Sequence, residues 1–365
     1  MSNKQKHNEN SIATSSRERL GTVGGQAVME GVMMMKKTDG VVAVAVRRAN
    51  GEIVKKTKDY KALSEKLKVS KIPIIRGFIN FIDMMKLAMG TLTESMEMLE
   101  LLEDEESGKP VEEKTDDDKK ENKNKEAEKG DSSKMIAAAS VIGIVLGLGL
   151  SFVLFFFLPT FLGGQIESAF IYNWEVALSP ALLSMFEGIL RLAIFLGYIL
   201  LVSQLKDIRR TFEYHGAEHK SIFAYEQGEE LTVENVRKYS RFHPRCGTSF
   251  LIIMILIGFV VGMIIPRDLW FRVLIRLALF PLVIGFAYEF IKLAGKHSEN
   301  ILVKIISAPG MWVQRLTTKN PDEGQLEVAI ASLKLALKLE EPDEIKPDEI
   351  LNEEHNITET ERLGN

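Results

Sequence analysis

Four long apolar runs constrain the fold of this chain more than any other feature. The first, Met135–Leu158, contains no charged residue in 24 positions. A helix of that length extends ~36 Å, which is enough to cross a hydrocarbon layer of ~30 Å. The other three are approximately 181–205, 249–265 and 273–291. Four such runs would be unusual in one soluble core. The sequence therefore predicts a mainly α-helical membrane protein with four transmembrane helices, two within 135–205 and two within 249–291.

The lysines and arginines between these runs predict how the chain is oriented. The stretch between the first two runs contains neither residue, whereas residues 206–248 contain eight. Because short cytoplasmic loops are enriched in lysine and arginine, the 206–248 loop and both termini are predicted to be cytoplasmic. The first 20 residues are polar and lack the apolar centre of a secretory signal. We therefore expect a multi-pass protein of the cell membrane, with the lipid bilayer as its first partner.

Overall charge and cysteine content exclude several other classes of protein. The 365 residues carry a formal net charge of −4 and a pI near 6.0, which argues against a nucleic-acid partner. A single cysteine, Cys246, excludes an intrachain disulfide and any site built from several thiolates. The mean hydropathy of +0.02 averages apolar runs with strongly charged segments, so substantial parts outside the membrane are expected.

The segments outside the membrane differ in their expected order. Residues 21–60 are predicted to form a small cytoplasmic antiparallel sheet, in which Asn50-Gly51 provides a type I′ turn between two strands. Residues 292–340 are predicted to contain the cytoplasmic C-terminal helices, including an amphipathic helix at 325–339. Polar and charged composition predicts disorder in three further segments, which are 1–20, 103–134 and 341–365.

Residues 61–102 are predicted to form amphipathic helices. Six charges between residues 72 and 102 exclude a simple span, and a helix lying in the headgroup region fits this pattern. A soluble helical hairpin is the competing interpretation. Five methionines lie in this segment and four lie within 29–35. Flexible thioethers on an amphipathic surface can accommodate varied apolar partners, whereas ordinary core filling is the alternative role.

The strongest chemical signal is the H-x-x-E-H pattern of His215, Glu218 and His219. Residues i and i+4 of a helix lie on one face, so both imidazoles can reach one metal ion. The carboxylate between them can accept a proton from a metal-activated water. A helix that buries two hydrogen-bonded histidines for structural reasons is the competing interpretation. Gly216 within the motif also disfavours a helix by ~1 kcal/mol relative to alanine.

A second cluster follows in the segment RFHPRC, where His243 and Cys246 are three residues apart. Imidazole and thiolate are zinc ligands, so these two residues and the two histidines of the first motif form a candidate tetrahedral set. A closed set of four would be structural, because a catalytic site keeps one position open. Catalysis would therefore require either His243 or Cys246 to lie outside the ligand set. A small buried apolar role is the alternative for Cys246.

Charges within the apolar runs are candidates for function or for pairing. Glu187 and Arg191 are four residues apart and are expected to pair on one helix face. Arg276 is expected to extend toward the membrane interface. Glu289 is expected to pair with a metal, with His297 or with a loop arginine.

Four segments resemble those of a bacterial membrane-protein family, the YqhQ-like proteins: GGQAVMEGVMMM, RGFINFIDMMKLAMGTLTESM, YHGAEHKSIFAYE and RFHPRCGTSF. The resemblance covers roughly residues 20–104 and 135–340. It implies a membrane protein of a family labelled only as predicted metal-dependent enzymes, with no established reaction to carry over. The residues behind that label would be His215, Glu218, His219, His243 and Cys246, which are all present.

Two functional hypotheses follow. In the first, the chain is an integral membrane protein with a divalent-metal site for zinc at the cytoplasmic face; if catalytic, it is a hydrolase with Glu218 as general base. In the second, it is a non-enzymatic accessory factor in membrane-protein biogenesis or insertion. Its partners would then be nascent membrane proteins or translocation machinery, and its metal would be structural or absent. A Glu218→Gln substitution separates the two, because only an enzyme should lose function while keeping its metal.

Overall fold

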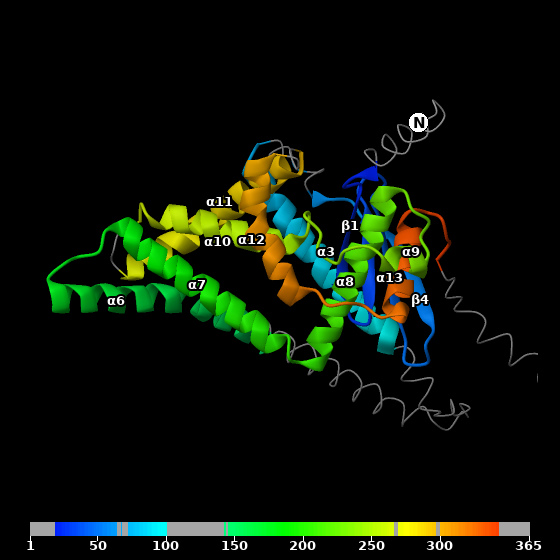
Figure 1. Cartoon of the computed structure of the whole chain (residues 1–365), viewed down its shortest axis with the longest axis horizontal. Helices are drawn as coiled ribbons and strands as arrows, with labels where there is room; N and C mark the ends of the chain where they lie inside the picture. The colour runs from blue at the N-terminus through cyan, green and yellow to red at the C-terminus, as the bar shows by residue number, and fades with distance from the viewer. Residues whose placement is uncertain are drawn as a thin grey trace, which may run out of the picture.

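The computed structural model describes residues 19–63, 67, 72–100, 142–143, 145–265, 269–296 and 300–342. The chain is mainly helical, with a four-stranded sheet toward one end and long apolar helices toward the other (Figure 1). The segments predicted to be disordered lie outside the described residues, apart from residues 19–20 and 341–342. Three of the six histidines, His7, His297 and His355, lie outside them as well.

The sheet is an antiparallel meander in the order β1-β2-β3-β4. Its strands are Val23–Val28, Gly31–Lys36, Val41–Arg47 and Ile53–Asp59. The two central strands, β2 and β3, are buried along most of their length. Strands covered on both faces have nearly continuous apolar sequences, which explains the run VVAVAV in β3. The predicted antiparallel sheet is confirmed.

The turn between β3 and β4 differs from the predicted type I′ turn. Gly51 has a positive φ of 89°, but Asn50 does not share it. The Gly51 N–H donates to Arg48 O at 2.9 Å, and the Arg48 N–H donates to Glu52 O at 2.9 Å. This is the pattern of a type I turn followed by a left-handed glycine. The type I′ prediction is wrong because the longer loop needs only one left-handed residue.

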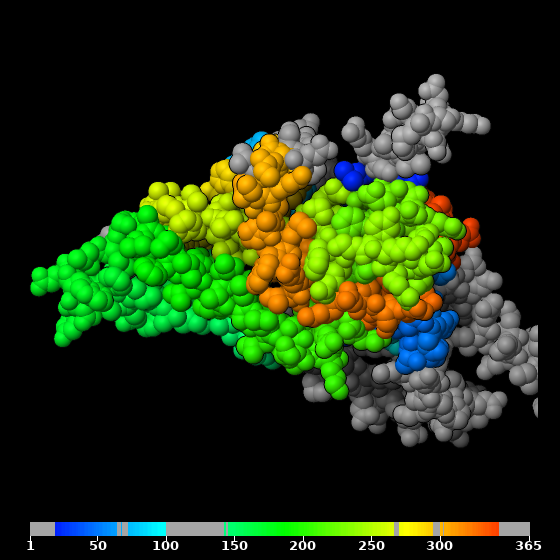
Figure 2. All heavy atoms as spheres, in the orientation of Figure 1, coloured from blue at the N-terminus to red at the C-terminus, as the bar shows by residue number. Residues whose placement is uncertain are grey.

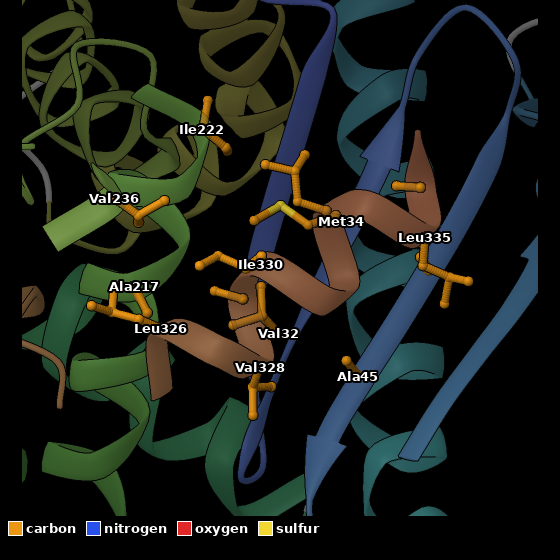
Figure 3. Close-up of a cluster of buried hydrophobic side chains, with 14 of the residues drawn as sticks. Val32, Met34, Ala45, Ala217, Ile222, Val236, Leu326, Val328, Ile330 and Leu335 are labelled. Atoms are coloured by element: carbon orange, nitrogen blue, oxygen red, sulfur yellow. The ribbon is translucent and has the colours of Figure 1, made fainter. Parts of the chain in front are cut away.

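Helices cover both faces of the sheet. One face packs against α3 (Ile75–Glu100), which contributes Leu87 and Met98 to the core. The other face packs against α8 (Lys206–Gln227) and α13 (Glu323–Ala336), which confirms the predicted C-terminal helix. Figure 3 shows this second core, which contains Val32, Met34, Ala45, Ala217, Leu326 and Ile330. The sheet is therefore the middle layer of three.

Three helices are long and apolar enough to cross a membrane. The first is a continuous helix, Val145–Trp174, that contains the π-helical turn Val153–Phe157 and α6 (Leu158–Trp174). The other two are α7 (Pro180–Val202) and α11 (Leu269–Lys296). The fourth predicted span corresponds to α10 (Gly247–Gly262), whose 16 residues extend only ~24 Å. The described residues thus contain three candidate spans and one shorter apolar helix.

The first apolar helix continues past Leu158, where the predicted span ended. Pro159 cannot donate to the carbonyl four residues earlier, and this carbonyl, Phe155 O, accepts a hydrogen bond from Arg191 Nε at 2.8 Å instead. The preceding turn widens into a π-helix, in which the Leu158 N–H donates to Val153 O. The proline is therefore accommodated inside the helix.

The charges within the apolar helices pair differently from the prediction. Glu187 of α7 lies 3.3 Å from Arg272 and also contacts Arg276, both on α11. Arg276 donates to Thr160 Oγ1 of α6 at 2.7 Å. We call Glu187, Arg272 and Arg276 the buried charge cluster. The predicted Glu187–Arg191 pair and the interfacial position of Arg276 are wrong, because the facing helix offers Glu187 closer cations than its own helix does.

Helix α3 connects the sheet to the apolar helices. Near its start, Gly77 lies against Gly285 of α11, and Arg76 forms an ion pair with Glu289. Glu289 therefore pairs with an arginine of α3 and not with the expected loop arginine, because α3 crosses α11 at this level. Another expected partner, His297, lies outside the described residues. The predicted amphipathic segment forms one helix, whose second half packs on the sheet.

Two further helices complete the described chain. The short helix α9 (Val233–Arg237) follows α8. Helix α12 (Ile301–Thr317) packs against α10 and lies at the surface between the sheet and the apolar helices, where Figure 2 shows it in orange. The chain that leaves α12 then passes along α8 before α13 begins, and this passage shapes the site described next.

Candidate metal centre

The H-x-x-E-H motif lies on a regular helix, as the metal interpretation requires. Helix α8 ends at Gln227, and the capping residue Gly228 has a φ of 80°. The rings of His215 and His219 lie side by side, with centroids 4.4 Å apart. His219 is only 2% exposed and Glu218 5%. The motif therefore faces the interior and not solvent.

Gly216 lets another segment of chain cross α8 at the motif. A Cβ atom at this position would overlap the carbonyl oxygen of Lys319. The Lys319 N–H donates to Phe212 O at 2.8 Å, which fixes the crossing segment against the helix. The sequence argument counted this glycine only as a helix-weakening residue. Its role is to admit the backbone that follows α12.

The crossing segment and the loop before α10 orient the two imidazoles. His215 Nδ1 lies 2.9 Å from Thr317 O, and His219 Nδ1 lies 2.5 Å from Arg241 O. A carbonyl oxygen can only accept, so each Nδ1 must carry the proton and donate it. In the neutral imidazole, each Nε2 then carries the lone pair of the ring. Metal-ligating histidines in proteins are held in this way.

Cys246 brings a thiol to the same point from a distant part of the sequence. It is the residue that immediately precedes α10. Its Sγ lies 3.3 Å from His215 Nε2. The donor atoms of His215, His219 and Cys246 all lie within 4.8 Å of one another. Two ligands of one tetrahedral zinc ion would be about 3.6 Å apart, given Zn–N and Zn–S bonds of about 2.1 and 2.3 Å. The three side chains therefore fit a zinc ion.

The Glu218 carboxylate lies close to the Nε2 atoms of both histidines. Its Oε2 lies 3.8 Å from His215 Nε2 and 4.0 Å from His219 Nε2. Burial raises the pKa of the Glu218 carboxyl to about 7, and the nearby His215 opposes this rise. Strand β1 approaches closely here, since a Cβ at Gly25 would lie 2.8 Å from Glu218 Cγ. Gly25 of the GGQAVMEG segment thus belongs to the site, which the sequence argument missed.

His243 is close to the centre, but its ring nitrogens have other partners. Its Nε2 lies 3.4 Å from Glu226 Oε2, and its Nδ1 accepts from the Arg245 N–H at 3.3 Å. The ring centroid lies 5.6 Å from that of His219. The structure therefore brings three of the four predicted ligands together and leaves His243 beside them. The four-ligand set stays a prediction.

Glu226 is the buried residue that holds His243 in place. Burial alone would raise the pKa of its carboxyl, but hydrogen bonds from His243 and from the Gly21 amide, with the charge of Arg245, hold that pKa below its ordinary value. Burial also lowers the pKa of His243. Sequence reasoning missed Glu226, although it lies seven residues after His219 and so shares its helix face.

A cavity of about 370 Å³ lies beside the metal centre and gives Cys246 access to a wider space. Its walls come from the loop before α10, from α10 itself, from the end of α11 and from α12. The candidate centre is therefore buried on the side of the sheet and connected to a cavity on the side of the apolar helices.

Comparisons with known proteins place these features in a family. A family described as a protein of unknown function (DUF1385) matches residues 72–339. The "Uncharacterized protein YqhQ" of Bacillus subtilis (strain 168) is 37% identical over 324 residues, which cover 87% of this chain and 92% of that relative. No solved structure matches the chain. The resemblance to YqhQ-like proteins is confirmed, and the region matched by the family contains His215, Glu218, His219, His243 and Cys246.

Proposed function

The chain belongs to the DUF1385 family of proteins of unknown function, and we propose that it is an integral membrane protein with a zinc centre at its cytoplasmic face. His215 and His219 would hold the ion through Nε2, and Cys246 through Sγ. The observation that carries this proposal is the pair of hydrogen bonds from Nδ1 to backbone carbonyls. They leave both Nε2 lone pairs beside the thiol, which is the arrangement a metal needs.

We further propose that this centre is hydrolytic. Three protein ligands are typical of catalytic zinc sites, in which the fourth position stays open. A bound zinc ion lowers the pKa of a water molecule to about 7. Glu218 would take the proton of the attacking water on Oε2 and then deliver it to the leaving group. A carboxyl whose pKa is about 7 can do both near neutral pH.

Metal analysis of the purified full-length chain tests the centre. We expect close to one zinc per chain in the wild type, and loss of zinc in His219→Ala and Cys246→Ala. Glu218→Gln is the matched control, because it changes a buried residue of the same helix without removing a ligand. Less than about a tenth of an equivalent of zinc in folded wild-type protein would contradict the proposal.

The proposed orientation is tested separately. We propose that the chain lies in the cell membrane with both termini in the cytoplasm, because residues 206–248 carry eight lysines and arginines whereas 159–180 carry none. Topology reporters fused within 175–179 should report the outside of the cell, and reporters fused within 229–232 the inside. The opposite pattern would overturn the orientation and leave the metal centre untouched.

A second candidate function, an accessory role in membrane-protein biogenesis, has its own observation. Met84, Met85 and Met89 of α3 are 49%, 46% and 53% exposed, whereas Met33 and Met34 of β2 are core residues. An exposed methionine surface can bind varied apolar segments. Photo-crosslinkers at positions 85 and 89 should then capture nascent membrane proteins or translocation machinery. Crosslinks to lipid alone would contradict this role.

A further inference from the structure

The cavity beside Cys246 combines positive charge with apolar surface. Arg245, Lys304 and Arg315 line it, and none of the described residues in its wall is acidic. Its apolar wall includes Ile253, Val303, Met311 and Trp312. A cavity of about 370 Å³ is within the usual range for small-molecule sites, which is ~300–1,000 Å³. Its occupant should therefore be both anionic and apolar.

The positive charge of this cavity is only partly balanced. Arg245 is bound by both carboxylate oxygens of Glu226, at 2.6 Å each. Within the described ranges, Lys304 and Arg315 have no carboxylate partner. Two cations are therefore available to an anionic ligand.

The position of the cavity favours a lipid as the source of that anion. The cavity lies where the ends of α10 and α11 meet α12. Leu293, Ile301 and Ile305, near or on α12, are each more than half exposed. Exposed apolar residues beside lysine, arginine and tryptophan are typical of a helix at the membrane interface. A free phosphate would satisfy the cations but leave the apolar wall uncovered.

We propose that this cavity binds the phosphate-bearing headgroup of an anionic membrane phospholipid. Lys304 and Arg315 contact the phosphate, as both residue types commonly do, and the acyl chains lie along the exposed apolar residues of α12. Because the cavity opens at Cys246, such lipids become the substrate class of the hydrolase. This last step rests on the proposed function, whereas lipid binding itself requires no metal.

Trp312 provides a direct probe of the cavity. The chain has three tryptophans, and Trp174 and Trp270 are both exposed, so Trp174→Phe and Trp270→Phe leave Trp312 as the only one. The full-length variant is reconstituted in phosphatidylcholine bilayers that contain either brominated phosphatidylglycerol or brominated phosphatidylcholine. Bromine quenches tryptophan only in close contact. We expect the anionic lipid to quench Trp312 at an about 25-fold lower mole fraction, because two cations at ~1 kcal/mol each contribute about fivefold apiece.

Charge variants assign the preference to the cavity. Lys304→Gln and Arg315→Gln should each reduce it about fivefold. Lys238→Gln is the matched control, since Lys238 carries the same charge, pairs at 3.7 Å with exposed Glu234 and does not line the cavity. Equal quenching by the two lipids, or a preference that survives both cavity substitutions, would overturn the proposal. Displacement of the lipid by millimolar inorganic phosphate would also overturn it in favour of a free anion.

The zinc content of the same preparation separates this inference from the proposed function. Zinc without a lipid preference contradicts the inference and leaves the metal centre supported. A lipid preference without zinc supports the headgroup site and contradicts the hydrolase, so that the cavity would serve a lipid-binding role alone.

Discussion

Within the described residues, the buried charge cluster and the candidate metal centre are built in opposite ways. In the buried charge cluster, Glu187 contacts cations from the facing helix, so opposite charges meet. In the candidate metal centre, the Nε2 atoms of His215 and His219 and the thiol of Cys246 face one another, and the Nδ1 atoms donate to backbone carbonyls. Converging lone pairs are stabilised by a cation. The first cluster therefore holds helices together, and the second is suited to binding.

The largest expected effect is on the first cluster. Glu187→Ala should lower the free energy of unfolding by about 3–5 kcal/mol, because it removes the buried carboxylate that Arg272 and Arg276 both contact. Thermal unfolding of the full-length protein in detergent measures this loss. Replacing all three charges with apolar residues of similar volume should recover much of it, since a buried ion pair is often no more stable than apolar packing. Unchanged melting of Glu187→Ala would show that the cluster is not structural.

The second effect concerns metal removal. Chelation should lower the free energy of unfolding by about 3 kcal/mol when free zinc is about 100 times its dissociation constant. The same chelator should have no effect on His219→Ala, which has already lost a ligand. The loss of stability caused by Glu187→Ala should be the same with and without the chelator, because the two clusters do not share residues. A chelator-sensitive His219→Ala protein would place the metal elsewhere.

The third effect is a pH dependence of the metal-free protein. Burial raises the pKa of Glu218 from 4.5 to about 7, so folding takes up a proton between these values. Stability should therefore fall as pH rises through this window, by about 2 kcal/mol between about pH 5 and pH 8. Glu218→Gln should remove that slope, because an amide does not titrate. Parallel pH profiles for the two chelated proteins would contradict the burial argument.

The same comparison shows what sequence could and could not predict. Periodicity and composition predicted the sheet, the motif helix α8 and the helix α13, because each depends on local pattern. They failed for Glu187 and Arg276, whose partners lie on helices that only tertiary packing brings together. Pro159 was misjudged as a boundary for a similar reason, since its helix continues past the proline and Arg191 of α7 donates to the freed carbonyl.

At the candidate metal centre, sequence predicted the residue types better than the geometry. The i, i+4 spacing predicted that His215 and His219 would share a face, and the ring positions agree. The spacing of His243 and Cys246 gave no reason to separate them, yet only the thiol joins the two imidazoles. The His243 ring contacts Glu226 instead, and Glu226 also forms a buried ion pair with Arg245. The carbonyls of Thr317 and Arg241 have no side-chain signature, so no sequence pattern could indicate them.

The smallest expected effect is the most diagnostic for the local fold. Helix propensity alone predicts that Gly216→Ala stabilises α8 by ~1 kcal/mol. The structure predicts the opposite sign, a loss of about 1–2 kcal/mol, because the added methyl group overlaps the Lys319 carbonyl and backbone cannot move as freely as a side chain.

The same substitution should also weaken zinc binding by about tenfold, because it displaces the Thr317 carbonyl that orients His215. Gly164→Ala is the matched control, since Gly164 is also a helical glycine and a Cβ there has no atom within 4 Å. The free energy of unfolding and the zinc affinity, measured for both variants, check these two expectations. A Gly216→Ala protein that is more stable and binds zinc normally would mean that the crossing segment does not hold the imidazoles. The contrast between a cluster held by charge and a centre held by backbone carbonyls would then be lost.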